Sequence, residues 1–331
     1  MRRWSGAGLI AGVIVLILVT AAGPSVGQGR PRIVVFSQQQ VQTTPFEMAQ
    51  EQGYYAEEGL EVVFRYFASG TTAWQSFRAG AGDIVYSGDV PAIRNWAESG
   101  RATRVIAPVE RNARGYGLVV RRAIRSAADL RGKRIAIRVG SSGSHFIWAY
   151  LRKHGMTERD VTIVNMDAPA AVAALDRGDI DGFFFWAPFP QRALEVSGDR
   201  VHILAHADAV GSGYYTMISA RGEWIRRNRA IVDRFLAASV RGREYAQRHK
   251  SQVLAYLNRK FQLDVLQAGA MYDVTDLLLR FDERFYQDLG SVADWMRETG
   301  LLSEPLVWSE FVYLDGLRGV DRALAVPPPK Q

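Results

Sequence analysis

Short apolar runs alternate with amphipathic segments from residue 32 to residue 109. The runs and segments have the lengths of strands and helices, and Gly, Pro or Ser marks most changes between them. The predicted strands are 33–36, 60–67, 83–86 and 103–109, and the predicted helices are 45–58, about 69–78 and 90–98. Strands that alternate with helices in this way are typical of βαβ units, so the pattern predicts an α/β fold with a parallel sheet covered on both faces.

The same alternation restarts near residue 115, and helices dominate beyond residue 221. The predicted strands are 115–121, 135–139, 161–164, 182–185, 201–204 and 214–220, and the predicted helices are 144–154, 169–177, 188–196, 223–226, 230–247, 252–260, 265–280 and 285–299. Two α/β blocks followed by helices predict two lobes, with the C-terminal helices on the first. The predicted domains are lobe 1 at 32–112 and 216–325, lobe 2 at 113–215 and a flexible tail at 326–331.

Two crossings of the chain, near 111–117 and 211–215, would join these lobes and form a hinge. Ligands bind at the carboxyl ends of parallel strands and between domains. The loops rich in Gly, Ser and Thr follow the predicted strands and open toward that place. The sequence therefore predicts a cleft between the lobes that closes around its ligand.

The N-terminal segment has the composition of a secretory signal peptide. Residues 1–4 are short and basic, residues 9–22 are apolar, and small residues follow up to Gly27. The apolar run is shorter than the roughly 20 residues that a membrane span prefers. Residues 1–27 are therefore predicted to be a signal peptide that is cleaved near Gly27 and directs the mature protein to the periplasm. An uncleaved membrane anchor is the alternative.

Composition excludes several kinds of site. The chain contains no cysteine, which rules out disulfides, thiol catalysis, cysteine-ligated zinc and iron–sulfur clusters. The formal net charge is +7, but the basic residues are spread along the chain, so nucleic acid is not an expected partner. His202 and His206 are four apart without a third ligand, and we predict neither a metal nor a cofactor.

The most informative loop follows the predicted strand 135–139. Residues 140–144, Gly-Ser-Ser-Gly-Ser, stand between that strand and a helix. The first N–H groups of such a helix are unpaired, and with the serine hydroxyls and the positive helix end they make a small anion site. Ser141, Ser142 and Ser144 are therefore predicted to donate hydrogen bonds to an oxyanion, unless one of them only caps the helix.

A second loop, with Ser69, Gly70 and Thr71, is predicted to face the ligand from the first lobe. Ser87 and Asp89 stand where the helix 90–98 begins, and Asp89 is interpreted as the N-cap of that helix. The alternative is a carboxylate that faces a ligand amine. Because a carboxylate beside a bound sulfonate would be repulsive, Asp89 discriminates between these ligand classes.

Several other side chains are candidates for ligand contact, each with a plainer structural alternative. A solvated loop is the alternative for the glutamines that follow the first strand, a hinge salt bridge for the arginine at the first crossing, and core packing for the histidine and the aromatic residues. These candidates are Gln39, Gln40, Arg114, His145, Trp186 and Tyr214.

Five segments carry a family resemblance that runs from about residue 32 to residue 316. They are AQEQGYYAEEGLEV at 49–62, FRAGAGDI at 77–84, SAADLRGK at 126–133, LDRGDIDG at 175–182 and WAPF at 186–189. In this order they resemble the periplasmic solute-binding proteins of ABC importers, in the branch that binds alkanesulfonates, taurine, nitrate and pyrimidine precursors of thiamine. The resemblance implies a two-lobed type II clamp with two hinge crossings, a small-molecule solute and an ABC permease in the inner membrane as partners.

The sequence thus predicts a monomeric solute-binding protein that delivers a small organic or oxyanionic, sulfonate-like solute by closure of a clamp. A binder of a pyrimidine or amine precursor of thiamine, a binder of an aromatic carboxylate, and a ligand-sensing lobe for a separate receptor are the alternatives. An enzyme is not predicted, because no G-x-S-x-G motif and no evident His–Asp pairing accompany the serines.

Overall fold

The computed structural model describes residues 29–330. The predicted signal peptide at 1–27 lies outside the described residues. The contacts divide the chain between Arg30 and Pro31, and all the helices and strands belong to the unit that begins at Pro31. Among the described residues, no helix has the length and apolarity that a crossing of the bilayer needs.

A six-stranded sheet has the order β11-β4-β10-β3-β1-β2. Its strands are β1 Arg32–Ser37, β2 Glu61–Tyr66, β3 Ile84–Gly88, β4 Thr103–Asn112, β10 Tyr214–Arg221 and β11 Asp276–Leu277. β1 pairs in parallel with β2 and β3, whereas β10 runs antiparallel to both β3 and β4. The prediction of a wholly parallel sheet is therefore wrong, because a strand from much later in the chain inserts between β3 and β4.

A five-stranded sheet has the order β7-β6-β8-β5-β9. Its strands are β5 Tyr116–Arg121, β6 Arg134–Ile137, β7 Thr162–Asn165, β8 Gly182–Trp186 and β9 Val201–His206. β6 is parallel to β7 and β8, and β5 is antiparallel to β8 and β9. This sheet is mixed as well, because β5, the strand that enters it, runs against the other four.

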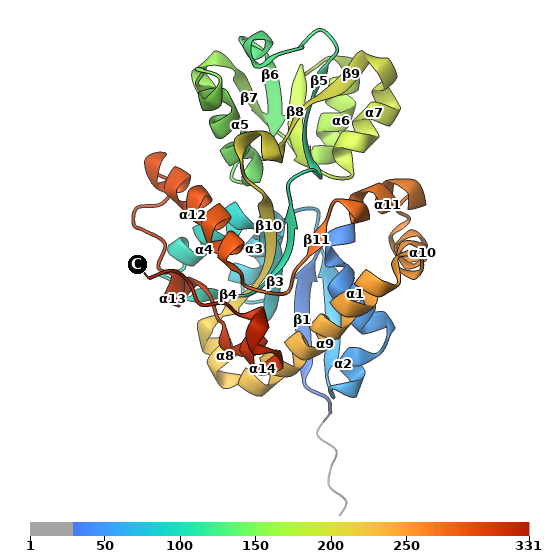
Figure 1. The fold of residues 1–331 in the computed structure, drawn as a ribbon, viewed down its shortest axis with the longest axis vertical. Helices are drawn as coiled ribbons and strands as arrows, with labels where there is room; N and C mark the ends of the chain where they lie inside the picture. Colours follow the sequence, from blue (N-terminus) through green and yellow to red (C-terminus); the bar gives the residue numbers. More distant parts are fainter. Residues whose placement is uncertain (1–28, 331) are drawn as a thin grey trace, which may run out of the picture. The chain divides into compact units, whose positions relative to one another are not determined.

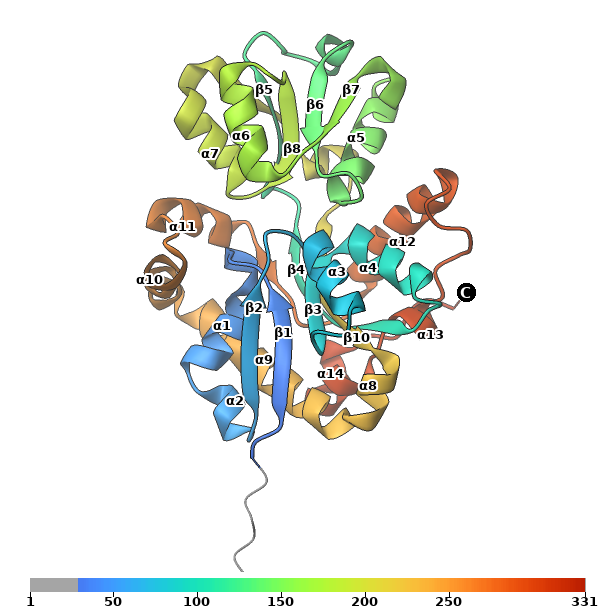
Figure 2. The same cartoon turned by 180° about the vertical axis from the view of Figure 1, so that it is seen from behind.

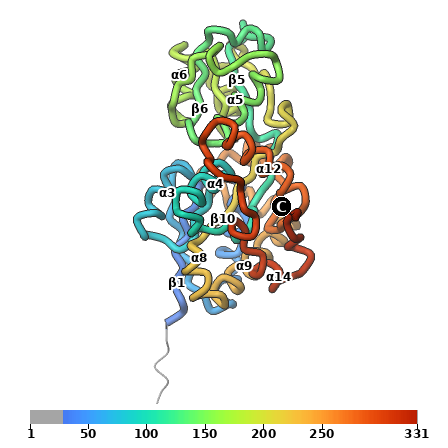
Figure 3. Tube along the Cα trace, turned by 90° about the vertical axis from the view of Figure 1, so that its left-hand side faces the viewer, coloured from blue at the N-terminus to red at the C-terminus, as the bar shows by residue number. Residues whose placement is uncertain are grey.

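The helices gather around the two sheets in two groups (Figure 1, Figure 2 and Figure 3). With the five-stranded sheet lie α5 Ser142–Lys153, α6 Ala168–Arg177 and α7 Phe189–Ser197. With the six-stranded sheet lie α1 Thr44–Glu51, α2 Tyr54–Glu57, α3 Gly70–Arg78, α4 Asp89–Glu98, α8 Gly222–Arg227, α9 Arg229–Arg248, α10 Lys250–Phe261, α11 Val265–Asp273, α12 Glu283–Glu298, α13 Trp308–Phe311 and α14 Asp315–Val320. The short 3-10 helices are η1 Val41–Thr43, η2 Ala127–Leu130, η3 Glu158–Asp160, η4 Gly198–Arg200, η5 Ala207–Val210 and η6 Arg322–Leu324.

We call the group around the six-stranded sheet lobe 1 and the group around the five-stranded sheet lobe 2. The chain passes from lobe 1 to lobe 2 between β4 and β5, and it returns between β9 and β10. The predicted domain limits at 112/113 and 215/216 stay a prediction. β10 begins at Tyr214, two residues before residue 216, where the second segment of lobe 1 is predicted to begin.

Two helix predictions need correction. The helix expected at 45–58 is two helices, because Gly53 adopts φ 75° between α1 and α2. The helix expected at 265–280 ends at Asp273, and residues 276–277 form β11 on the edge of the six-stranded sheet. There they pair with Arg111 and Glu110 of β4. The hydrogen bonds of this pairing favour a strand over a helix, and local helix propensity does not reveal them. α13 and α14 were not predicted.

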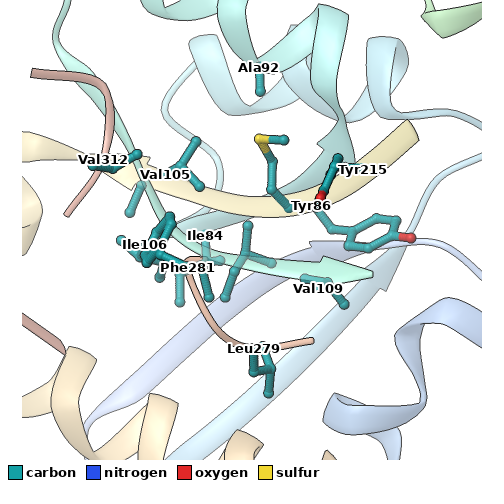
Figure 4. Close-up of a cluster of buried hydrophobic side chains, with 14 of the residues drawn as sticks. Ile84, Tyr86, Ala92, Val105, Ile106, Val109, Tyr215, Leu279, Phe281 and Val312 are labelled. Carbon is teal, nitrogen blue, oxygen red and sulfur yellow. The ribbon is translucent and has the colours of Figure 1, made fainter. Parts of the chain in front are cut away.

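The core of lobe 1 lies on the face of β3, β4 and β10 that Figure 4 shows. Val105, Ile106 and Val109 of β4 are fully or almost fully buried there. Leu279 and Phe281, which follow β11, and Val312 close this cluster from the C-terminal part of the chain. The C-terminal segments therefore belong to the core of lobe 1 and hold β4 in place.

Helix α9 packs against α1 at a point where only glycine fits. A Cβ added at Gly242 would lie 2.0 Å from the carbonyl oxygen of Pro45 and 2.7 Å from the backbone nitrogen of Ala49. Both atoms belong to backbone and cannot swing aside. Gly242 thus allows the close approach of these two helices.

We expect Gly242→Ala to destabilise the protein by about 1–3 kcal/mol or more, because an overpacked contact must push the helices apart. Gly290→Ala is the matched control: it also lies inside a helix, but its Cβ would meet nothing nearer than 4.0 Å. There the better helix propensity of Ala should stabilise by up to about 1 kcal/mol. Urea unfolding measures both, and equal midpoints for the two variants would contradict the proposed role of Gly242.

Candidate functional site

A cavity lies between the two sheets and contains about 470 Å³ of empty space, part of it open to solvent. Lobe 1 contributes residues from the ends of β1, β3 and β4, from β10 and from the first turns of α3 and α4. Lobe 2 contributes the start of β5, the loop before α5 and the end of β8. The lining residues are Gln38, Gln40, Gln42, Ser69, Gly70, Thr71, Gly88, Pro91, Glu110, Tyr116, Arg138, Ser141, Ser142, Trp186 and Thr216.

The N-terminus of α3 forms one wall of the cavity. Ser69 caps this helix: its Oγ accepts a hydrogen bond from the backbone N–H of Thr72, and Thr72 Oγ1 accepts from the backbone N–H of Ser69. Gly70 is required by the close approach of β3, because a Cβ there would lie 2.8 Å from the Cβ of Ser87. The cap leaves the N–H groups of the first turn, at Gly70 and Thr71, on the cavity wall.

The N-terminus of α5 forms the opposite wall. Ser141 is the N-cap: its Oγ accepts from the backbone N–H of Gly143 at 3.2 Å and donates to the carbonyl of Arg138 at 2.7 Å. Ser144 accepts from the backbone N–H of Gly140 at 3.1 Å. The helix therefore starts two residues before the predicted position 144, and its loop is held by its own serines.

Arg138 is the only Lys or Arg among the described residues that line the cavity. It follows β6 directly, and its Nη1 lies 3.4 Å from Asp167 Oδ1 on the edge of lobe 2. Its Nε is buried and has no hydrogen-bond partner within the described part of the protein. A guanidinium at this place, beside two helix N-termini, makes the cavity attractive to an anion.

Asp89 is fully buried behind the cavity wall and does not line it. The N-cap of α4 is Gly88, so the interpretation of Asp89 as the N-cap is wrong. Its Oδ1 accepts from the Val90 N–H and from Ser142 Oγ, both at 2.7 Å, and Oδ2 accepts from the Tyr215 N–H at 3.3 Å. Burial raises the pKa of Asp89 to about 6, and the hydrogen bond from Ser142 is the largest opposing effect.

Further contacts join the lobes beside the hydrogen bond from Ser142 to Asp89. The indole of Trp295, on α12 of lobe 1, lies 5.2 Å from the His145 ring and 6.3 Å from the Trp148 ring, both on α5 of lobe 2. One turn further along the two helices, Arg152 forms an ion pair with Glu298. The lobes thus meet along α5 and α12 in the conformation described.

Half of the predicted site residues line the cavity, and half lie elsewhere. The lining ones are Gln40, Ser69, Gly70, Thr71, Ser141, Ser142 and Trp186, and the others are Gln39, Ser87, Asp89, Arg114, Ser144, His145 and Tyr214. Whether any of them contacts a ligand stays a prediction.

The residues outside the lining have structural partners or face solvent. Ser87 Oγ accepts from Trp74 Nε1 at 2.9 Å, and Arg114 is exposed with its Nε 3.4 Å from Asp208 Oδ2. His145 Nδ1 and the Tyr214 hydroxyl are 2.9 Å apart and hydrogen-bonded, and burial lowers the pKa of His145 to about 4. This histidine is therefore neutral at physiological pH.

Eight lining residues are not among the predicted site residues. Arg138 could have been found, since a charged residue that ends a strand just before a Gly/Ser loop points to the site. Glu110 and Thr216 could not, because they face each other only through the antiparallel pairing of β4 with β10. The eight are Gln38, Gln42, Gly88, Pro91, Glu110, Tyr116, Arg138 and Thr216.

The described residues contain no group of three or more His, Cys, Asp or Glu placed to hold a metal ion. His206 Nδ1 is hydrogen-bonded to the carbonyl of Tyr116 at 3.2 Å. Burial lowers the pKa of His202, and the nearby Arg122 and Arg125 lower it further.

Curated relatives of this chain are binding proteins. The taurine-binding periplasmic protein of Escherichia coli (strain K12) is 33% identical over 173 residues, 52% of this chain and 52% of that protein. Putative binding proteins of Brucella species are 29% identical over 193 residues, 57% of this chain and 59% of theirs. The chain therefore spans little more than half the length of these curated relatives.

Solved structures share the fold. The alkanesulfonate-binding protein SsuA from Xanthomonas axonopodis pv. citri, bound to MOPS, has a TM-score of 0.73 and 19% identity, over 85% of this chain and 98% of that one. The desulfurization enzyme DSZB has a TM-score of 0.66 and 16% identity, over 88% and 99%. These likenesses confirm the predicted fold class, the two-lobed fold of periplasmic binding proteins.

The NMT1/THI5-like family profile matches residues 40–252. The match includes the loops before α3 and α5, and every lining residue except Gln38. With well over half of its residues matched, the chain belongs to the NMT1/THI5-like family.

Proposed function

We propose that this chain is an extracytoplasmic solute-binding protein that delivers a small, sulfonate-like oxyanionic solute to an ABC importer. Its relatives support this role, since their names describe binding of taurine or alkanesulfonates. The signal-peptide pattern of residues 1–27 supports export to the periplasm. The mature protein would act as a monomer, with a permease in the inner membrane as its partner.

The observation that carries this proposal is the convergence of three anion-binding features on one cavity. The N-termini of α3 and α5 approach it from opposite lobes, and Arg138 lies beside the second. Helix N-termini offer unpaired N–H groups and a partial positive charge, and a guanidinium adds a full charge and directional donors. The serine hydroxyls are largely used within the loops, so the backbone N–H groups and Arg138 would supply most of the binding.

Asp89 does not oppose a bound oxyanion in this arrangement. Its carboxylate is turned toward Val90, Ser142 and Tyr215, and it does not line the cavity. The hydrogen bond from Ser142 instead ties the loop before α5 to lobe 1. Asp89 would therefore favour the closed arrangement of the lobes in which both helix N-termini reach the solute.

The role we propose is binding and not catalysis. Among the described residues that line the cavity there is no His to act as a base, and Ser141 donates to a backbone carbonyl. The solute would be released unchanged when the lobes separate at the permease.

A second candidate solute is favoured by the aromatic part of the wall. Trp186 and Tyr116 line the cavity from lobe 2, and Pro91 lines it from lobe 1. Such surfaces suit a flat ring. A pyrimidine precursor of thiamine or an aromatic carboxylate is therefore the alternative to an alkanesulfonate.

We expect short alkanesulfonates to raise the unfolding midpoint of the mature protein, from Gln28 onward, in a thermal-shift measurement. A ligand that binds only the folded state stabilises it by about 2.7 kcal/mol at 100 times its Kd. Nitrate, benzoate and an aminopyrimidine complete the panel, and glycerol serves as the neutral control. A shift with the aminopyrimidine or benzoate alone would replace the sulfonate by the second candidate. No shift with any of them would contradict the proposed solute classes.

We expect Arg138→Gln to weaken binding of ethanesulfonate by roughly 10- to 100-fold, because a hydrogen bond to a charged group is worth about 1.5–3 kcal/mol. Arg177→Gln is the matched control, since Arg177 also lies on lobe 2 but pairs with Asp179 at the surface. Isothermal titration calorimetry measures both affinities. An unchanged affinity in Arg138→Gln would remove Arg138 from the proposed anion site.

A further inference from the structure

Glu110, Gln42 and Thr216 are three of the buried polar side chains with which lobe 1 lines the cavity. Glu110 of β4 is 0% exposed, Gln42 of η1 is 1% exposed, and Thr216 of β10 is 6% exposed. Glu110 and Thr216 stand opposite each other in the antiparallel pairing of their strands. The two residues are therefore held at fixed positions by the sheet.

The oxygens of these three side chains have no hydrogen bond of ordinary geometry within the described residues. This holds for both carboxylate oxygens of Glu110, for Gln42 Oε1 and for Thr216 Oγ1. Burying such groups unpaired is costly, and a lone buried carboxylate is the most costly of them. The Glu110 carboxylate can only accept, and the Gln42 oxygen and the Thr216 hydroxyl can also accept, so a donor-rich ligand would satisfy this part of the cavity wall.

Glu47 is a second buried carboxylate of lobe 1, and its partners provide a comparison for Glu110. Glu47 is also 0% exposed, but it accepts hydrogen bonds from the hydroxyls of Tyr66 and Tyr256 and from Lys260 Nζ, each at 2.9 Å. No Lys or Arg of the described residues forms an ion pair with Glu110. The contrast sets Glu110 apart as a carboxylate without an internal counterion.

Among the described residues, the groups that shift the pKa of Glu110 carry no positive charge. The charge of Glu110 acts on Tyr86 of β3 and Tyr116 of β5, and the side chains of Asn112 and Thr216 approach its carboxylate as donors, although not in ordinary hydrogen-bond geometry. The adjacent Arg111 pairs with Asp288 at 2.7 Å, and β11 places Leu277 beside Glu110. Burial raises the pKa of Glu110 well above its ordinary value, against the smaller opposing effects of Asn112 and Thr216.

We propose that Glu110, together with Gln42 and Thr216, binds a cationic nitrogen of the solute, which is therefore a zwitterion with an ammonium group at one end and an oxyanion at the other. This inference rests on the proposed function, because the oxyanion is taken to meet Arg138 and the helix N-termini. Glu110 would be the residue that selects the ammonium-bearing solute over the plain anion of the same length.

The wall offers enough acceptors for an ammonium group. An ammonium group has three N–H donors and no acceptor, and the four unpaired oxygens of Glu110, Gln42 and Thr216 offer it enough acceptors. An ammonium beside Glu110 also favours the ionised carboxylate. A Glu110 that is protonated before binding would therefore pass its proton to the solvent when the cation arrives.

The test compares two probes that differ only in the ammonium group, 2-aminoethanesulfonate and ethanesulfonate. We expect the wild-type protein to bind 2-aminoethanesulfonate at least about 10-fold more tightly, as a charge-assisted contact implies. In Glu110→Gln the two probes should bind with about equal affinity, because the amide has no charge and its N–H groups need acceptors of their own. Titration calorimetry gives the affinities, and circular dichroism spectra and melting curves verify that the variant is folded.

Asp89→Asn is the matched control, since it also neutralises a buried carboxylate near the cavity, but one whose oxygens have partners in the protein. Both affinities can change together in this variant, whereas the preference for the ammonium should remain as in the wild type. A second readout is proton release, measured in two buffers of different ionisation enthalpy at pH 6. 2-Aminoethanesulfonate should release protons, up to about one per solute, from the wild type and none from Glu110→Gln.

The outcomes separate this inference from the proposed function. If ethanesulfonate binds as tightly as 2-aminoethanesulfonate, or if Glu110→Gln keeps the preference, the role of Glu110 is overturned while the anion site stands. If the preference is lost in Asp89→Asn but kept in Glu110→Gln, the cation meets Asp89 instead. If neither probe binds, both the sulfonate function and the zwitterion are overturned.

Discussion

The antiparallel pairing of β4 with β10 is the constraint on which the rest of the molecule depends. It brings Asn112, the last residue of β4, next to Tyr214, the first of β10, so the two passages of the chain between the lobes lie side by side. The same strand pairing places Glu110 opposite Thr216 in the lining of the cavity. Leu279, Phe281 and Val312 pack on β4 from the C-terminal part of the chain. One strand pair therefore fixes both the connection between the lobes and the positions of Glu110 and Thr216 in the cavity.

The cavity combines a positive and a negative region in a small volume. The N-termini of α3 and α5 and Arg138 make the first, and the buried carboxylate of Glu110 makes the second. Each of these charged groups costs free energy while no group of opposite charge is bound to it. The hydrophobic clusters around the two sheets offset the free energy that such unsatisfied groups cost. A solute that satisfies both regions at once gains from each, which is a basis for discrimination among anions.

Local patterns were sufficient to predict most elements of this fold and part of its site. Strand and helix periodicity located nearly every strand and the longer helices, and the Gly/Ser loop at 140–144 located one wall of the cavity. The predictions that failed concern segments whose pairing partners are distant in the sequence. β10 inserts antiparallel between β3 and β4, and β11 replaces the end of a predicted helix because β4 has an open edge there. Asp89 looked like the important carboxylate because it begins a helix, whereas Glu110 reaches the cavity only through sheet pairing.

The meeting of α5 with α12 has a practical meaning for how the molecule can be observed. Trp148 belongs to lobe 2 and Trp295 to lobe 1, and their rings are 6.3 Å apart. His145 contacts the second indole, and Arg152 lies over the first. Any separation of the lobes must move these two indoles apart and admit water between them. The protein therefore carries its own optical reporter of opening, since the emission of a buried indole responds to the polarity of its surroundings and needs no attached dye.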